Sequence, residues 1–515
     1  MNRLSVLALP LLVPVALAAQ SPQAVARAAA TITEADVRRR VHLLADDSMK
    51  GRDTPSPELE MAARYIAAEF QRFGLKAGGD SGTFIQRYGV TRKQLDTATS
   101  TLTVSGPAAA TLRLGPDVNV LPFVAVSGSE LSGPVVVLSG PADSANPFGG
   151  QDIKGAWIVM PATAGGPAAG LSADFPTLQA AVTGGGARGV VLVSNRTDSL
   201  WQAATRRIAR PAMIMDGAAA SQFDIALLEI RDATAQRVFG LDAAALRTAT
   251  VRTGRRLDGV TLTFKPTMNV LSRVNAPNVV GILEGSDPQL KNEYVVYSAH
   301  MDHVGVTAGG RCQARGADSI CNGADDDASG TVAVIEAAEA FASLQPRPKR
   351  SLVFLTVSGE ERGLWGSGYF ADHPPVPVGQ IVANVNIDMI GRNWKDTIVV
   401  IGKEHSDLGA TLNRVGAAHP ELNMQPINDI WPQENFYFRS DHYNFARKGV
   451  PILFFFSGTH PDYHQVSDHP DKIDAEKEAR IVKLVFYLGL EVANAAQKPQ
   501  WNPESYKQIV QQATN

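Results

Sequence analysis

YVVYSAHMDHVGVTAGGRCQARGADSICNGADDDASG, residues Tyr294–Gly330, is the stretch that says most about the fold and the chemistry of this chain. It begins with apolar and β-branched residues, which predict a buried strand. The strand runs into His300, Asp302 and His303, and a glycine-rich loop then reaches three consecutive aspartates, residues 325–327. The next segment, TVAVIEAAEAFASL, has the composition of a helix.

The three aspartates, residues 325–327, create an electrostatic problem that packing alone does not solve. Adjacent carboxylates repel one another, and a buried carboxylate is costly unless it has a partner. A multivalent cation removes both difficulties, because carboxylate oxygens are common metal ligands. We therefore predict a metal site where the strand and the acidic loop meet.

The N-terminus has the pattern of a targeting segment. Arg3 precedes an apolar run, Leu4–Ala19, that contains two prolines and ends in small residues suited to cleavage. The run is short for a membrane anchor, so we predict a signal peptide over residues 1–19 and a secreted or periplasmic protein. The formal net charge of −3 is close to neutral and gives no reason to expect nucleic acid or a membrane surface as partner.

Composition separates the remaining chain into parts. Residues 32–74 look helical and lie in an N-terminal helical part over residues 20–95. Residues 96–265 are rich in short β runs, glycine and proline, with a helix expected near residues 178–188. We expect residues 20–95 to join residues 266–500 in one catalytic domain, with residues 96–265 as a β-rich insertion and residues 501–515 as a tail.

After residue 266, apolar strands alternate with helices. This pattern predicts an α/β fold with a mixed, largely parallel sheet and helices on both faces. A long amphipathic helix is expected over residues 476–495. The expected strands are Val279–Leu283, Tyr294–Ser298, Leu352–Val357, Ile381–Ile387, Ile398–Ile401 and Ile452–Phe456.

Candidate ligands follow the expected strands, where chemistry is usually found in such sheets. His300, Glu360, Glu361 and Asp388 occupy these positions. Each has an ordinary alternative explanation, such as a core histidine or a solvated loop acid. Together they favour one metal cleft. Only two cysteines are present, so a four-thiolate site is excluded. Histidine ligands favour zinc over Mg²⁺ or Ca²⁺, which prefer oxygen.

The motifs SAHMDH, GADDDASG, SGEERGLWGS, NIDMIG, SDH and DYHQVSD occur in this order. They resemble the co-catalytic di-zinc aminopeptidase family, whose superfamily includes glutamate carboxypeptidase, glutaminyl cyclase and the transferrin receptor. The pattern DIKGAWIVMPA…AAVTGGGARGVVLVSN is similar to a protease-associated domain, at about residues 120–250.

The resemblance implies two zinc ions per chain that share one carboxylate. His300, Asp326 and Asp388 would hold the first zinc. Asp326, Glu361 and His464 would hold the second, with Asp325 and Asp327 as neighbours rather than ligands.

The resemblance also assigns residues around the metals. Glu360 would be the general base that activates a metal-bridging water, and Tyr463 would support the oxyanion. Asp302 would orient His300, and Asp441 with His442 would support the site.

These assignments lead us to expect a metallo-aminopeptidase that acts on peptides with a free N-terminus. A carboxypeptidase and a glutaminyl cyclase share the fold and remain alternatives. A receptor-like binding protein is the alternative from another class, although a base beside intact ligands counts against it. The sequence predicts neither the side-chain preference nor the oligomeric state.

The two cysteines, Cys312 and Cys321, lie in the loop between His300 and Asp326. Export would place them in an oxidising compartment, so we predict a disulfide between them. We expect this bond to hold the rim of the cleft in shape.

Overall fold

The fold was analysed in a computed structural model, which describes residues 20–121, 129–143, 145–162, 177, 180–181, 186–208, 210–217 and 226–511. The expected signal peptide and most of the helix expected near residues 178–188 lie outside the described residues. The chain forms two compact units. The first unit combines Met1–Tyr88 with Asn275–Asn515, and the inserted unit is Gly89–Val274.

The first unit is built on a mixed sheet in which β14, β13, β15 and β18 are neighbours and parallel. β12 runs antiparallel to β14, and β16 runs antiparallel to β18. The α/β fold class with a mixed sheet is therefore confirmed. The strand bounds are β12 (Met268–Leu283), β13 (Tyr294–His300), β14 (Ser351–Val357), β15 (Ile381–Ile387), β16 (Thr397–Ile401), β17 (Gln425–Ile427) and β18 (Ile452–Phe456).

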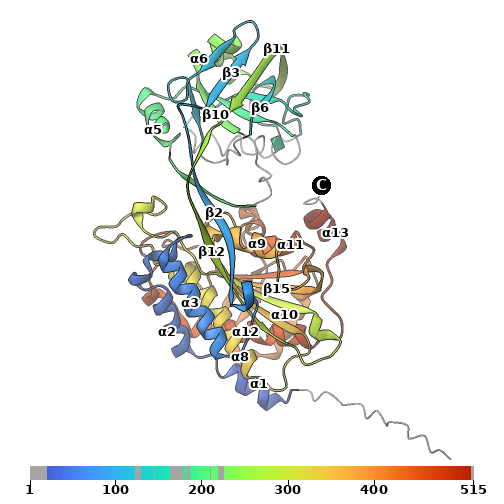
Figure 1. Ribbon diagram of the computed structural model, residues 1–515. Coiled ribbons are helices and arrows are strands. Elements are labelled where there is room, and N and C mark those ends of the chain that lie inside the picture. The colour runs from blue at the N-terminus through green and yellow to red at the C-terminus, as the bar shows by residue number, and fades with distance from the viewer. Residues whose placement is uncertain are drawn as a thin grey trace, which may run out of the picture. The chain divides into compact units, whose positions relative to one another are not determined.

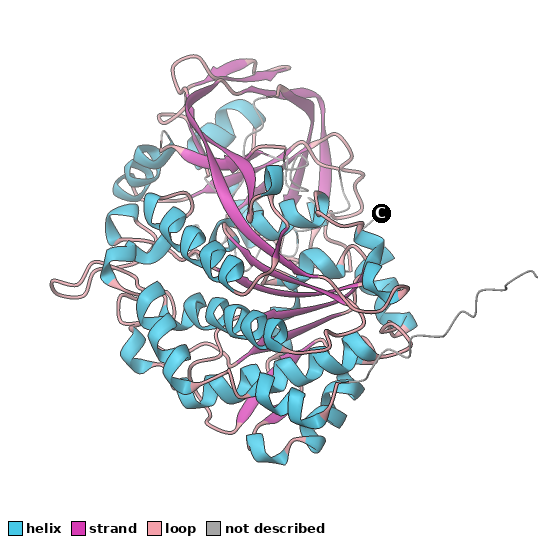
Figure 2. Ribbon diagram, turned by 60° about the horizontal axis from the view of Figure 1, so that its bottom comes forward, coloured by secondary structure: helices cyan, strands magenta, loops and turns pink. Residues whose placement is uncertain are grey.

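Helices cover both faces of this sheet (Figure 1, Figure 2). Successive side chains of β13 alternate between two cores, because neighbouring residues of a strand point to opposite faces. Tyr297 packs in the core that includes Phe341, whereas Val296 packs in the core that includes Phe370 and Phe445. The helices are α1 (Pro22–Ala29), α2 (Glu34–Leu44), α3 (Pro57–Arg72), α8 (Gly330–Ser343), α9 (Trp365–Asp372), α10 (Leu408–Ala418), α11 (His442–Ala446), α12 (Ala475–Asn494) and α13 (Pro503–Tyr506).

The helical run expected over residues 32–74 is interrupted between α2 and α3. Thr33 caps α2 by accepting the N–H of Asp36, and Ser56 caps α3 by accepting the N–H of Leu59. Between them the backbone turns sharply, with positive φ at residues 50–52. The helical pattern does not extend through this segment because it carries Arg52, whose contacts require an irregular backbone.

Arg52 connects this irregular segment to the strand that leads to the acidic loop. Its fully buried guanidinium donates to the carbonyls of Met301, Leu44, Asn322 and Gly323. Arginine offers several donors in a fixed plane, so one side chain satisfies backbone groups from three segments. The end of β13 and the start of the acidic loop are thereby fixed to each other.

The inserted unit contains an eight-stranded sheet in the order β4-β3-β11-β6-β7-β8-β10-β5. This confirms the predicted β-rich insertion. The strands are β3 (Thr101–Ser105), β4 (Ala110–Leu112), β5 (Val118–Val120), β6 (Leu131–Ser139), β7 (Trp157–Pro161), β8 (Gly189–Ser194), β10 (Ala226–Arg231) and β11 (Thr253–Lys265). The helices are α5 (Asp198–Ile208), α6 (Asp232–Phe239) and α7 (Ala243–Thr248).

Two shorter pairings involve the remaining strands, β1, β2 and β9. β1 (Lys76–Ala77) pairs with the first-unit part of β12. Within the inserted unit, residues Val90–Lys93 of β2 (Ile85–Leu95) pair with β9 (Ala212–Met215).

Among the described residues, no helix combines the length and apolar character that crossing a membrane requires.

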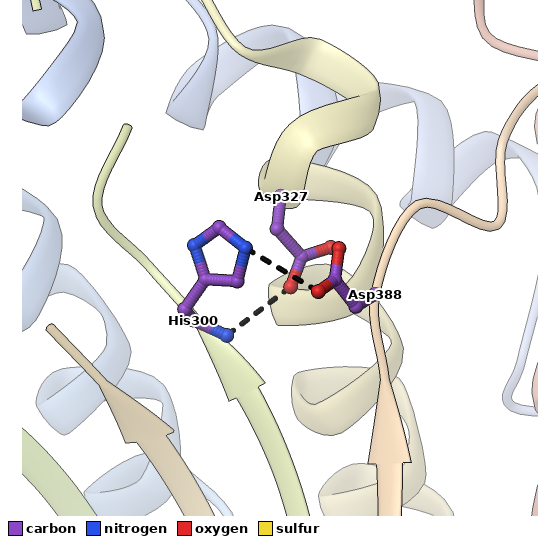
Figure 3. A group of neighbouring side chains, drawn as sticks. All are labelled: His300, Asp327 and Asp388. Carbon is purple, nitrogen blue, oxygen red and sulfur yellow. Dashed lines mark hydrogen bonds and ion pairs between the residues drawn. The ribbon is translucent and has the colours of Figure 1, made fainter. Parts of the chain in front are cut away.

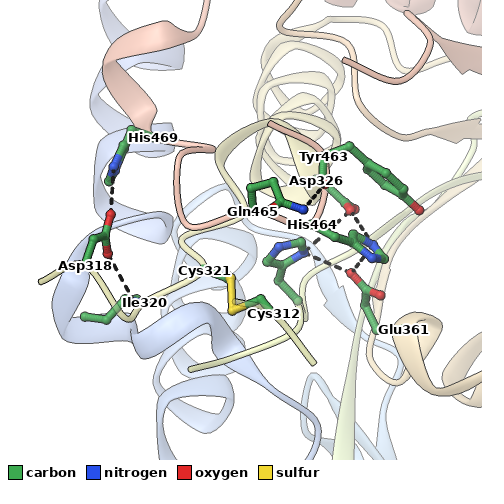
Figure 4. The surroundings of a disulfide bond; sticks show 11 residues. Cys312, Asp318, Ile320, Cys321, Asp326, Glu361, Tyr463, His464, Gln465 and His469 are labelled. Atoms are coloured by element: carbon green, nitrogen blue, oxygen red, sulfur yellow. Dashed lines mark hydrogen bonds and ion pairs between the residues drawn. A yellow bond between two sulfur atoms is a disulfide. The ribbon is translucent and has the colours of Figure 1, made fainter. Parts of the chain in front are cut away.

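The predicted disulfide is present between Cys312 and Cys321 (Figure 4). Both cysteines are buried in a small apolar cluster with Val304 and Val466. Val304 follows the end of β13, and Val466 lies two residues after His464. The bond closes the loop on itself, and its packing in this cluster places the loop against two segments that carry predicted ligands.

Replacing both cysteines in a Cys312→Ala/Cys321→Ala variant should lower the free energy of unfolding by about 2–3 kcal/mol, because the unfolded chain regains loop freedom. Chemical unfolding of the two proteins with and without reductant measures this difference. Reductant should destabilise the wild-type protein and leave the variant unchanged. Equal stability of the two proteins in the oxidised state would contradict the expectation.

Candidate metal centre

The predicted ligands meet beyond the carboxyl ends of adjacent parallel strands. His300 is the last residue of β13, and Asp388 directly follows β15. Glu360 and Glu361 follow β14 after Gly359, whose positive φ of 72° makes the turn. The strand order places β13 between β14 and β15, so the three strand ends converge.

The first cluster of ligand atoms contains His300, Asp326 and Asp388. His300 Nε2 lies 3.2 Å from Asp326 Oδ1 and 3.6 Å from Asp388 Oδ2. Ser440 donates a hydrogen bond of 2.8 Å to Asp388 Oδ2 and fixes that carboxylate. Burial lowers the pKa of His300, but Asp388 and Glu360 outweigh burial and raise this pKa well above its ordinary value.

The second cluster contains Asp326, Glu361 and His464 (Figure 4). His464 Nε2 lies 3.1 Å from Asp326 Oδ2 and 3.2 Å from Glu361 Oε1. Burial raises the pKa of Glu361, but the nearby histidines outweigh it and bring this pKa to about 2. Burial lowers the pKa of His464, whereas Asp326 and Glu361 raise it, to about 10.

The two oxygens of Asp326 therefore face different clusters, Oδ1 toward His300 and Oδ2 toward His464. Asp326 Oδ2 is buried and has no hydrogen-bond partner among the described residues, and the same holds for Glu361 Oε1. Buried oxygens normally have a partner, so these atoms fit ligands of a cation.

The neighbouring aspartates are engaged by other groups. Asp327 accepts the backbone N–H groups of His300, Gly330 and Met389. It also lies close to His300 and Asp388 (Figure 3), but these three amides already use its carboxylate. Asp325 accepts the N–H of Gly391 and lies 3.1 Å from His460 Nε2. Both residues thus hold the acidic loop in place.

Asp302 contacts His300 in a different way from the one expected. His300 Nδ1 lies 3.1 Å from the backbone carbonyl of Asp302, whereas the nearest carboxylate oxygen is 3.7 Å away. That carboxylate instead accepts the hydroxyl of Thr54 and the backbone N–H of Glu360. Asp302 therefore orients the imidazole through its main chain and the Glu360 loop through its side chain.

Glu360 and Tyr463 line a small cavity together with His300, Asp326 and Asp388. Burial raises the pKa of Glu360 well above the ordinary value of a glutamate. Tyr463 stacks on His464, with ring centroids 4.0 Å apart. The remaining wall of the cavity is formed by Met389, Phe436, Arg439, Ser440, Phe454, Phe456 and Thr459.

The SDH segment supports the site mainly through its serine, which sequence reasoning did not single out. Ser440 donates a hydrogen bond to Asp388, whereas the buried carboxylate of Asp441 has no hydrogen-bond partner among the described residues. Burial raises the pKa of Asp441 to about 7. The buried ring of His442 lies with Nε2 2.7 Å from the carbonyl of Tyr437 and supports that loop.

Sequence reasoning also left two contacts unassigned. Arg311, from the disulfide loop, donates to the backbone carbonyl of Glu361 and lies 3.6 Å from Glu361 Oε2. His303 lies beside Glu361 and Asp326, with Nδ1 2.9 Å from Glu361 Oε1. The motif SAHMDH contains this histidine, but spacing alone does not show where the chain turns after β13.

The donor set fits zinc. Both clusters combine imidazole nitrogen with carboxylate oxygen, the usual ligands of zinc when thiolates are absent. The carboxylates and histidines are concentrated in a buried region, where a divalent cation would offset the repulsion among the acids.

Comparison with known proteins agrees with the motifs. Residues 278–489 match the profile of peptidase family M28, which confirms the resemblance. A probable zinc metalloprotease of Pyrenophora teres f. teres is 27% identical over 184 residues, which are 30% of this chain and 37% of that protein. A probable leucine aminopeptidase of Arthroderma otae is 26% identical over 227 residues, which are 42% of this chain and 58% of that protein.

The chain therefore spans less than two thirds of the length of these two relatives. Among solved structures, the aminopeptidase from Aneurinibacillus sp. strain AM-1 is 18% identical, with a TM-score of 0.50. The similarity covers 92% of this chain and 97% of that one. At this identity the comparison supports the fold.

His442 should make the fold sensitive to acid, because burial lowers the pKa of its ring to about 3. In the unfolded chain the pKa of this imidazole is about 6.5. Between the two pKa values, the unfolded chain therefore binds a proton that the folded chain does not bind. The free energy of unfolding should fall by up to about 1.4 kcal/mol per pH unit as the pH drops below about 6.5.

Chemical unfolding of the wild type and a His442→Gln variant between pH 7.5 and pH 5 measures this contribution. The variant retains a side-chain donor for Tyr437 but cannot titrate, so its stability should depend less on pH. Identical pH dependence in the two proteins would show that His442 is not held neutral.

Proposed function

We propose that the protein is a zinc-dependent aminopeptidase that removes N-terminal residues from peptides, since residues 278–489 match the profile of peptidase family M28. The observation that carries the proposal is the position of Asp326. One of its oxygens faces His300 and the other faces His464, as a carboxylate shared by two metals requires. His300, Asp326 and Asp388 would hold one zinc, and Asp326, Glu361 and His464 would hold the other.

Bound there, two zinc ions would polarise the scissile carbonyl and make a water molecule easier to deprotonate. The chain's own residues supply the proton transfers. Glu360 has no assigned ligand role and lines the same cavity, so it is free to accept a proton from the attacking water and return it to the leaving amine. The raised pKa of Glu360, caused first by burial, favours such a proton carrier.

The residues around Glu360 position it and the substrate. Asp302 accepts the backbone N–H of Glu360 and thereby holds the base beside the ligands. Tyr463, in the cavity wall, would donate its hydroxyl to the oxygen on which negative charge develops. Burial raises the pKa of Tyr463 above its ordinary value, so the hydroxyl keeps the proton it must donate.

Acidic groups in the cavity favour a substrate amine over a substrate carboxylate. Glu360 and Asp388 line the cavity and would attract a free N-terminus. Arg439 also lines it and is the feature that a carboxypeptidase would use. Its guanidinium, however, lies over the ring of Phe436 and contacts Glu434, which offsets its charge. These contacts rank the aminopeptidase ahead of the carboxypeptidase.

The same proposal includes export of the protein, because the sequence pattern of residues 1–19 is that of a signal peptide. A buried disulfide agrees with folding in an oxidising compartment. We further propose that the inserted unit, Gly89–Val274, is an accessory domain of the protease-associated type. N-terminal sequencing of the protein recovered from outside the cytoplasm tests the cleavage near Ala19.

Glu360→Gln should lower turnover on the order of 10²–10⁴-fold while zinc content and unfolding behaviour stay unchanged, because only the proton carrier is lost. Glu361→Gln is the matched control, an identical change one residue away that removes a predicted ligand. It should lower zinc content. Loss of zinc from the first variant with retention in the second would reverse the two roles.

Peptides with a free N-terminus should be cleaved, whereas the same peptides with an acetylated N-terminus should resist cleavage, because the blocked amine no longer attracts Glu360 and Asp388. Mass analysis of the products from both substrates distinguishes the alternatives. Release of the C-terminal residue from acetylated peptides would establish a carboxypeptidase. Cyclisation of an N-terminal glutamine without hydrolysis would establish a glutaminyl cyclase.

A further inference from the structure

His303 is a buried histidine that the proposed zinc sites do not yet use. Its side chain is fully shielded from solvent, and neither ring nitrogen has a hydrogen-bond partner among the described residues. A buried imidazole without partners is unfavourable, because its polar atoms lose water and gain nothing in return. The residue therefore requires an explanation, and its surroundings provide one.

The Nδ1 atom of His303 lies among the atoms of the second cluster. It is 2.9 Å from Glu361 Oε1 and 3.6 Å from Asp326 Oδ2. His464 Nε2 contacts the same two oxygens at 3.2 Å and 3.1 Å. Among the described residues, both oxygens lack a hydrogen-bond partner despite these short distances.

These distances agree with four ligands around one ion. Zinc holds nitrogen and oxygen ligands at about 2.0–2.1 Å, so the corners of a tetrahedral zinc site lie roughly 3.3–3.4 Å apart. Of the six separations among these four ligand atoms, the four between an imidazole nitrogen and a carboxylate oxygen are 2.9, 3.1, 3.2 and 3.6 Å, and they surround that value. The rings of His303 and His464 meet at 74°, which brings the two imidazoles from different directions.

The loop around His303 leaves its ring little freedom. A side-chain carbon added at Gly323 would lie only 2.4 Å from the His303 ring, so the Gly323 backbone packs directly against it. The backbone N–H of His303 donates to the carbonyl of Arg52, and Arg52 in turn donates to the carbonyl of Gly323. A ligand held by such packing loses little freedom when it binds an ion.

We propose that His303 is a fourth protein ligand of the second zinc, beside Asp326, Glu361 and His464. This assignment rests on the proposed function. It makes the two zinc sites unequal, because the first has only His300, Asp326 and Asp388. Four protein ligands are typical of sites that retain their metal, whereas three leave a position open for water or substrate. The second zinc is therefore the retained ion, and the first zinc is the exchangeable and more open one.

The assignment predicts two classes of zinc in the wild-type protein. During titration with a chelator, one zinc should leave first and the other should require a higher chelator concentration. In a His303→Ala variant the retained ion should bind at least about 10-fold more weakly, since even loss of a residue behind a ligand costs 10–100-fold in metal affinity. Metal content after each chelator step is the readout, and no assay of activity is needed.

His442→Gln is the matched control, because His442 is an equally buried histidine that lies outside both clusters. The control should keep the wild-type pattern of zinc release. If His303→Ala also keeps that pattern, His303 is not a ligand and the inference is wrong. If the wild type binds no zinc, the proposed function itself fails, so the two failures are distinguishable.

Wild-type crystals loaded with one equivalent of zinc provide a test that does not depend on a variant's folding. Anomalous scattering at the zinc edge should place most of the metal among His303, Asp326, Glu361 and His464. Preferential occupancy of the site near His300 and Asp388, or a zinc beyond bonding distance of His303, would overturn the assignment.

Discussion

The structure depends on how a buried carboxylate, that of Asp326, is compensated. Its two oxygens face two separate groups of histidines and acids, and one of them has no hydrogen-bond partner among the described residues. An isolated ionised carboxylate in such surroundings would be very costly. The fold meets this constraint by bringing ligands from the ends of three adjacent parallel strands, which fixes the position of a cation before it binds.

Backbone hydrogen bonds hold much of the acidic loop in place. Asp327 accepts three amides, and Asp468 accepts the N–H groups of Asp325 and Asp326. Arg52 binds the carbonyls on both sides of the gap between β13 and this loop. Asp325 and Asp327 thus accept backbone hydrogen bonds that hold the loop. Of the three aspartates, Asp326 is the one whose carboxylate is available to bind a metal. In the second cluster, the guanidinium of Arg311 donates to the backbone carbonyl of Glu361 and supports that ligand.

The sheet and its ligand positions could be predicted from sequence because each central strand is a run of apolar residues that ends abruptly in a polar one. His300 and Asp388 follow directly from that pattern. The function of His303 could not be predicted, since it depends on the path of the chain after β13, and that path is set by Arg52 some 250 residues earlier in the sequence. Ser440 was missed for a similar reason. The motif suggested Asp441 and His442, but the start of α11 turns the serine toward Asp388. Asp302 lies beside His300, and its backbone carbonyl makes a closer contact with the imidazole than its carboxylate does.

The central claim is that one carboxylate, Asp326, is shared by two zinc ions in each chain. Elemental analysis of the dialysed wild-type protein tests it most directly, because Asp326 is the one residue that faces both groups of ligands. The account predicts about two zinc ions per chain. A folded protein that retains one zinc ion or none per chain after dialysis against buffer containing the metal would contradict it.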